Sequence, residues 1–177
     1  MIEIYVDGSC KDNGAKENFG GFGVVALSNN EDLQSDPRIL YTYSKQVKNT
    51  TNNRMELSAL LYALELTQVK YKQEKCVIKS DSAYCVNIFN NWIYNWNKNN
   101  WTRYKNQPIE NLDLIKQIWE YCKLEWPNFD VVKVRGHDNI LGNEIADALA
   151  TASTIKLAKI LEENEIEYEW ESFFDIG

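Results

Sequence analysis

The sequence predicts a single α/β domain, and three observations support this class. The chain has 177 residues, of which 44% are hydrophobic, so it fits one domain with a sizeable core. Apolar and polar residues alternate at the start of the chain, as in a β-strand, whereas leucines further along recur at the spacing of an amphipathic helix. Short connections between the first three predicted strands favour an antiparallel meander.

Net charge and cysteine spacing indicate the possible binding partners and the cellular compartment of the protein. The net charge of −7 is unfavourable for nucleic-acid binding, but residues 155–177 hold two lysines against seven acidic residues and account for most of it. The four cysteines are widely spaced: Cys10, Cys76, Cys85 and Cys122. Their spacing fits free thiols in a reducing compartment, and no stretch approaches the roughly 18 apolar residues of a membrane span. We therefore expect a cytoplasmic protein without a membrane partner.

The first predicted strand leads to a carboxylate. Polarity alternates over residues 2–7, which places Asp7 at the strand's exit, next to Gly8. A strand exit suits a metal ligand, because the sheet fixes the backbone and the loop beyond leaves room for substrate. Taken alone, Asp7-Gly8-Ser9 is more typical of a turn.

Two further strands are predicted at residues 22–27 and 39–47. Gly20, Gly21 and Gly23 lie in or before the first of them. Their order does not match a dinucleotide-binding fingerprint and no predicted helix follows, so we interpret them as strand and turn glycines.

Two more carboxylates stand at predicted element ends. Glu56 precedes a run of leucines at helical spacing, and Thr or Asn residues just before it can cap the helix. Asp81 follows a buried strand at residues 76–80 and precedes a short helix at residues 83–89. Each has a structural explanation as well: Glu56 in the first turn would interact favourably with the helix dipole, and Asp81 would serve as an N-cap.

Aromatic and amide side chains dominate residues 91–106, which also hold several cations. Such a surface can stack on sugars or bases and contact phosphates. Alternatively, Trp92 and Trp96, four residues apart, pack a helix onto the core, and both interpretations can hold together.

The second half of the chain adds a fourth carboxylate. A helix at residues 112–124 and a strand at residues 129–134 lead to a loop with the single histidine, His137. A helix beginning near Gly142 follows, in which Asn143 and Asp147 share one face.

Four carboxylates therefore stand at the ends of separate predicted elements. Hard oxygen ligands of this kind suit Mg²⁺ or Mn²⁺, and two such ions can activate a water and stabilise a leaving oxygen in phosphoryl displacement. The residues alone thus indicate a metal-dependent phosphodiesterase.

Five stretches resemble type 1 ribonuclease H in the order in which that family carries them. They span roughly residues 1–153 and are Tyr5-Val-Asp-Gly-Ser-Cys10, Thr51-Asn-Asn-Arg-Met-Glu-Leu57, Ser80-Asp-Ser82, the tryptophan-rich residues 92–114, and Arg135-Gly-His137 with Gly142-Asn-Glu-Ile-Ala-Asp147. The resemblance implies a five-stranded mixed sheet, three strands antiparallel and then two parallel, with helices on both faces. It also implies hydrolysis of the RNA strand of RNA/DNA hybrids.

The resemblance assigns catalytic roles residue by residue. Asp7, Glu56, Asp81 and Asp147 would bind two Mg²⁺ ions, with Mn²⁺ as a possible substitute and Asp7 bridging both. One ion would position the attacking water and the other the departing 3′ oxygen, leaving 5′-phosphate and 3′-hydroxyl ends. His137 would assist proton handling or product release.

Substrate contacts follow by the same analogy. Near the 2′-hydroxyls of the RNA we expect Asn13, Asn52, Asn53 and Glu56. Thr51 and Asn13 would hold a DNA phosphate, and Trp96 would contact DNA sugars. The segment with the tryptophans has only Lys98, Arg103 and Lys105 as cations, which predicts a flat salt dependence of hybrid binding.

The chain divides into a catalytic domain, residues 1–153, and a C-terminal segment, residues 154–177. Residues 155–161 are predicted to continue the last helix of the domain. An acidic and aromatic tail follows, and it resembles a degenerate sliding-clamp-binding peptide at Glu167, Trp170, Phe173 and Phe174. We expect a monomeric, free-standing enzyme.

Three alternatives remain open from the sequence. The chain could be a catalytically weak or silent hybrid-binding module of the same fold, although all four carboxylates are present. A resolvase or transposase nuclease would share clustered carboxylates but has no reason to keep the tryptophan-rich region. Third, the chain could be a part of a reverse transcriptase polyprotein.

Overall fold

The computed structural model describes residues 1–28, 38–136 and 138–167. Within these residues, five strands form one sheet in the order β3-β2-β1-β4-β5. Their bounds are β1 Ile2–Lys11, β2 Phe19–Ser28, β3 Arg38–Lys48, β4 Cys76–Ser80 and β5 Phe129–Lys133. The first three are antiparallel, and β4 and β5 run parallel to β1. The predicted mixed sheet is confirmed.

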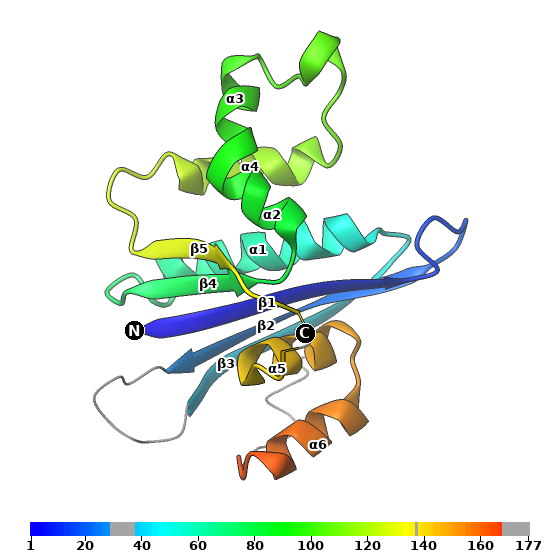
Figure 1. Cartoon of the computed structure of the whole chain (residues 1–177), viewed down its shortest axis with the longest axis vertical. Helices are drawn as coiled ribbons and strands as arrows, with labels where there is room; N and C mark the ends of the chain where they lie inside the picture. The colour runs from blue at the N-terminus through cyan, green and yellow to red at the C-terminus, as the bar shows by residue number, and fades with distance from the viewer. Residues whose placement is uncertain (29–37, 137, 168–177) are drawn as a thin grey trace.

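Helices cover both faces of this sheet. They are α1 Asn52–Val69, α2 Ala83–Asn87, α3 Ile93–Lys98, α4 Leu112–Cys122, α5 Leu141–Ala150 and α6 Thr154–Glu163. A π-helical turn, Ile88–Trp92, joins α2 to α3. Figure 1 shows α1 to α4 on one side of the sheet and α5 with α6 on the other. Among the described residues, no helix combines the length and the apolar character that a membrane span requires.

Each face of β1 is buried in its own hydrophobic core. Ile4 and Val6 belong to the core that includes Leu60 of α1. Tyr5, on the opposite face, belongs to the core with Leu149 of α5. Alternating residues of β1 thus point to opposite layers, as the pleat requires.

The strand β1 is longer than the sequence predicts, and Asp7 does not stand at its exit. Antiparallel pairing with β2 continues to Lys11, opposite Phe19. Parallel pairing with β4 stops earlier, at Val6 opposite Ser80. Asp7 therefore lies inside a strand, at the point where β1 loses its neighbour on one side only.

Gly20, Gly21 and Gly23 lie within β2, as predicted for strand glycines, and the last two lie against α5. A Cβ at Gly21 would overlap the Ala150 carbonyl, and one at Gly23 would overlap the Ala146 carbonyl. These two glycines allow the helix to pack closely on the strand.

The last helix does not continue α5, contrary to the prediction. Ala152 adopts a left-handed backbone conformation, with φ of 51°. The Ser153 hydroxyl then accepts a hydrogen bond from the Lys156 N–H and caps a new helix, α6. The chain therefore changes direction between α5 and α6.

Candidate active site

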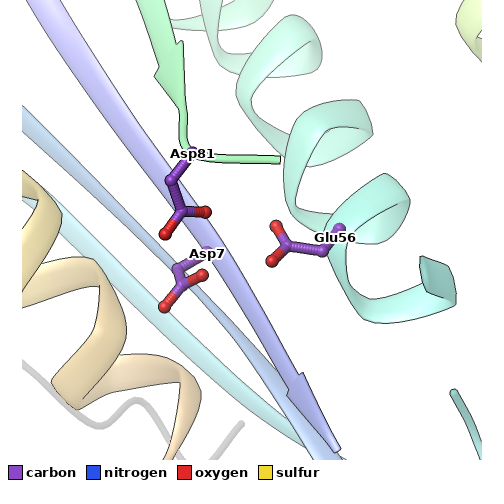
Figure 2. Close-up of side chains that lie close together, drawn as sticks. All are labelled: Asp7, Glu56 and Asp81. Carbon is purple, nitrogen blue, oxygen red and sulfur yellow. The ribbon is translucent and has the colours of Figure 1, made fainter. Parts of the chain in front are cut away.

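Three carboxylates from separate elements meet where β4 ends beside β1. Asp7 comes from β1, Glu56 from α1, and Asp81 directly follows β4. One carboxylate oxygen of each lies within 4.8 Å of those of the other two. Figure 2 shows the three side chains converging on one point. Residues distant in sequence thus form one acidic cluster.

Glu56 reaches the cluster because α1 packs closely on β1. A Cβ at Gly8 would overlap the backbone of Met55 and Glu56. Since α1 begins at Asn52, Glu56 lies in its second turn. The dipole interaction predicted for the first turn therefore does not account for this carboxylate.

Replacing Gly8 by alanine is expected to destabilise the protein by about 1–3 kcal/mol, because the added methyl group must push α1 away from β1. The free energy of unfolding from urea denaturation measures this effect. Ser9→Ala, which alters a neighbouring position of the same strand, serves as the control. Equal stability of the Gly8→Ala variant and the wild type would contradict the close packing.

Asp81 is not the N-cap of α2, which corrects one of its two predicted roles. The Ser82 hydroxyl accepts the hydrogen bond from the Cys85 N–H, at 3.2 Å. A Cβ at Gly136 would lie 3.1 Å from Oδ2 of Asp81. The loop that follows β5 therefore passes beside this carboxylate.

Asp147 lies inside α5, near the cluster but not among the three closest carboxylates. The prediction that it stands at a helix start is wrong, since α5 begins at Leu141. Its Oδ2 forms an ion pair with Nζ of Lys156. Asp147 is nevertheless close enough to Asp7 to contribute to that residue's altered pKa.

The cluster gathers acidic side chains around one buried carboxylate, that of Asp7. Asp7 is 6% exposed. Burial raises its pKa above the ordinary value, and repulsion from Glu56 and Asp81 raises it further. Burial, followed by repulsion from Asp81, likewise raises the pKa of Glu56.

A divalent cation fits this arrangement. Oε2 of Glu56 is buried and has no hydrogen-bond partner among the described residues. Closely spaced carboxylate oxygens are the ligands that Mg²⁺ and Mn²⁺ prefer. A bound cation would satisfy this oxygen and neutralise the mutual repulsion.

Four of the predicted substrate-binding residues gather at the start of α1. The Oδ1 atom of Asn13 accepts a hydrogen bond from the Asn52 N–H at 3.2 Å, which joins the β1–β2 loop to the helix. The Thr51 hydroxyl caps α1 by accepting from the Arg54 N–H at 3.1 Å. Asn13, Thr51, Asn52 and Asn53 are all exposed.

Two of the three tryptophans in residues 91–106, Trp96 and Trp101, pack against the core. Trp96 is half-buried against the core, with its ring centroid 6.0 Å from that of Trp92. Trp101 packs edge-on against Trp119. The core-packing interpretation is confirmed for Trp96, whereas Trp92 is 41% exposed and is not part of the core cluster. Tyr104, at 84% exposed, is the most accessible aromatic of the segment.

Some predicted residues lie outside the described part of the chain. They are His137 and, in the tail, Trp170, Phe173 and Phe174. Lys156, by contrast, was missed by the sequence analysis. A lysine nine residues after Asp147 gives no local signal, because the contact depends on the change of direction at Ala152.

A match to a protein-family model identifies the proteins to which this chain is related. The model described as RNase H matches residues 1–155. The chain belongs to the ribonuclease H family. Ribonuclease H of Orientia tsutsugamushi (strain Boryong) is 37% identical over 164 residues, which cover 93% of this chain and 88% of that protein. Ribonuclease H of Chlorobium phaeobacteroides (strain BS1) is 39% identical over 153 residues, covering 85% and 92% respectively.

Solved structures of the ribonuclease H family agree with this assignment. LC9-RNase H1, described as a type 1 RNase H with the type 2 active-site motif, superposes with a TM-score of 0.68 at 26% identity, covering 95% of this chain and 86% of its own. LC11-RNase H1 in complex with an RNA/DNA hybrid has a TM-score of 0.59 at 23% identity, covering 91% and 99%, and supports the fold alone. Membership of the ribonuclease H family makes the chain an enzyme of the nuclease class.

Proposed function

We propose that the chain hydrolyses the RNA strand of RNA/DNA hybrids with two divalent metal ions, leaving 5′-phosphate and 3′-hydroxyl ends. The observation that carries this proposal is the convergence of Asp7, Glu56 and Asp81 from three elements. Membership of the ribonuclease H family supports the substrate class. The LC11-RNase H1 structure, which contains an RNA/DNA hybrid, is consistent with it.

Asp7, Glu56, Asp81 and Asp147 would hold the ions, which we propose to be Mg²⁺ or, as a substitute, Mn²⁺. When bound, they would supply an activated water and stabilise the departing 3′ oxygen. Asp7 is suited to bridge two ions, because it is central to the cluster and interacts with each of the other carboxylates. His137 would move a proton or assist product release, and Gly136 beside Asp81 supports this place for its loop.

The exposed start of α1 would hold the hybrid. Asn13, Asn52 and Asn53 carry amide groups that can read the 2′-hydroxyls of RNA. Thr51 and Asn13 would bind a DNA phosphate beside the N-terminal N–H groups of α1, which favour an anion. Trp96 would contact DNA sugars with the part of its ring that remains accessible.

Cleavage of three labelled duplexes in Mg²⁺ tests the proposal. The RNA/DNA hybrid should be cut within its RNA strand, whereas RNA/RNA and DNA/DNA duplexes should remain intact. The RNA products should accept a label at the 5′ end only after phosphatase treatment. Binding of the hybrid without cleavage would instead favour the silent module, and cleavage of all three duplexes would exclude the proposed selectivity.

Binding of the hybrid is expected to depend weakly on salt. The tryptophan-rich segment offers three exposed cations, Lys98, Arg103 and Lys105, and each phosphate contact adds about 0.9 to the slope of log affinity against log salt. Replacing all three by glutamine should therefore lower the slope by at most about 3.

Fluorescence anisotropy with labelled hybrid at several salt concentrations, with catalysis blocked by chelator, measures this slope. Lys72→Gln with Lys75→Gln is the control, because these exposed lysines lie before β4, at the end opposite Asp81. A steep slope that the triple replacement leaves unchanged would contradict the prediction.

We further propose that residues 1–153 form the catalytic unit of a monomeric, cytoplasmic enzyme. Four cysteines without disulfides support a reducing compartment. Contact of the tail with a sliding clamp stays a prediction.

A further inference from the structure

A lysine from the C-terminal segment contacts the acidic site. Lys156 lies in α6, just beyond the residues that match the family model. Its Nζ pairs with Oδ2 of Asp147 and lies 3.4 Å from Oε2 of Glu144. Both acidic residues belong to one face of α5, since they are three positions apart. The cation is therefore held between two carboxylates of the helix that carries Asp147.

Packing fixes the position of this lysine. The Lys156 N–H donates to the Ser153 hydroxyl at 3.2 Å, in the first turn of α6. The neighbouring Leu157 and Leu161 are fully buried in the core that includes Leu149 of α5. Figure 1 shows α6 following α5 on the sheet face away from α1. The α6 backbone thus holds Lys156 at the edge of the active site, with its side chain about one-third exposed, at 36%.

Lys156 and a bound divalent cation would compete for the Asp147 carboxylate. Both are attracted by the same carboxylate, and they repel each other at short range. Asp147 also faces Asp7, whose pKa it helps to raise. In the protein without metal, Lys156 thus supplies positive charge to a group of acidic side chains that repel one another.

We propose that Lys156 is a positioning residue that orients the Asp147 carboxylate and weakens divalent-cation binding by competing for it. This rests on the proposed function, in which Asp147 is a metal ligand. A purely structural lysine, which only joins α6 to α5, would alter the stability of the fold and leave metal affinity unchanged.

Calorimetric titration of Mn²⁺ into the metal-free full chain, without nucleic acid, tests this role. Lys156→Met is expected to lower the Kd for Mn²⁺ about three- to tenfold, the scale expected for removing one charge near a divalent ion in a partly hydrated site. Lys156→Arg keeps the charge and should remain close to the wild type.

Lys159→Met is the matched control. Lys159 lies on the same helix, is 75% exposed and pairs with Glu163 rather than with α5. Its replacement makes the same change in net charge and should alter the Kd by less than about twofold. Thermal unfolding in chelator verifies that each variant is folded before titration.

Equal or weaker Mn²⁺ binding by Lys156→Met, relative to Lys159→Met, would overturn the proposal. An Asp147→Asn variant distinguishes a wrong role for Lys156 from a wrong assignment of Asp147 as a metal ligand. If Asp147→Asn weakens Mn²⁺ binding and Lys156→Met does not strengthen it, only the role of Lys156 is wrong. If Asp147→Asn has no effect on Mn²⁺ binding, Asp147 is not a ligand and the proposed role of Lys156 is wrong as well. Cleavage of the hybrid by the wild type tests the proposed activity separately.

Discussion

Replacing Asp81 by asparagine is expected to lower the rate of hybrid hydrolysis by more than about 100-fold. Loss of an outer-shell partner of a metal site already costs about 10–100-fold, and this change would remove a ligand itself. The amide has nearly the same shape as the carboxylate, and α2 is capped by Ser82. The fold should therefore persist while the reaction fails.

Single-turnover cleavage of labelled hybrid in saturating Mg²⁺ measures this loss. Asp130→Asn is the matched control, because Asp130 is an exposed aspartate on β5, the strand next to β4. It should retain nearly the full rate. An active, folded Asp81→Asn variant would remove Asp81 from the catalytic set and overturn the assignment of the cluster.

Replacing Asp7 by asparagine is expected to abolish cleavage and, without metal, to stabilise the fold. The folded protein raises the pKa of Asp7 above its ordinary value of 3.8, through burial and through repulsion from Glu56 and Asp81. Between these two pKa values the folded state binds more protons than the unfolded chain. The free energy of unfolding therefore falls as pH rises above about 4.

Thermal unfolding in chelator at pH 5.5 and pH 8 tests the sign. The wild type should lose stability at the higher pH, and Asp7→Asn should unfold roughly 5 °C above it at pH 8, because the asparagine needs no proton uptake on folding. Added Mg²⁺ should raise the unfolding temperature of the wild type more than that of the variant. A variant that is less stable than the wild type at pH 8 in chelator would contradict the electrostatic account.

The parts of the fold that the sequence predicts well are those with a strong local pattern. The strand at residues 76–80 and a Thr or Asn cap before α1, which is Thr51 in the structure, follow from apolar runs and capping residues. Neither pattern predicts the length of a strand that pairs further with one neighbouring strand than with the other. The length of β1 and the place of Asp7 therefore emerge only from the pairing with β2 and β4.

The site shows the same limit. Acidic residues at the ends of predicted elements were the candidate metal ligands, and three of them converge in the structure. The ion pair of Asp147 with Lys156 could not be predicted, because it depends on the left-handed backbone at Ala152 and on the packing of α6. Burial of Trp96 was similarly ambiguous, since an aromatic at helical spacing suits a core and a binding surface equally.

The central position of β1 has a consequence for the order in which the protein is made. The strand that carries Asp7 is synthesised before the other strands of the sheet, yet Tyr5 on its second face is covered by α5, which is synthesised more than a hundred residues later. The core on this face of β1 is thus completed only when α5 packs on it, through contacts of long sequence separation. A nascent chain in which α5 is still inside the ribosome would lack the finished core beside Asp7, so the nuclease would become competent only after α5 has emerged.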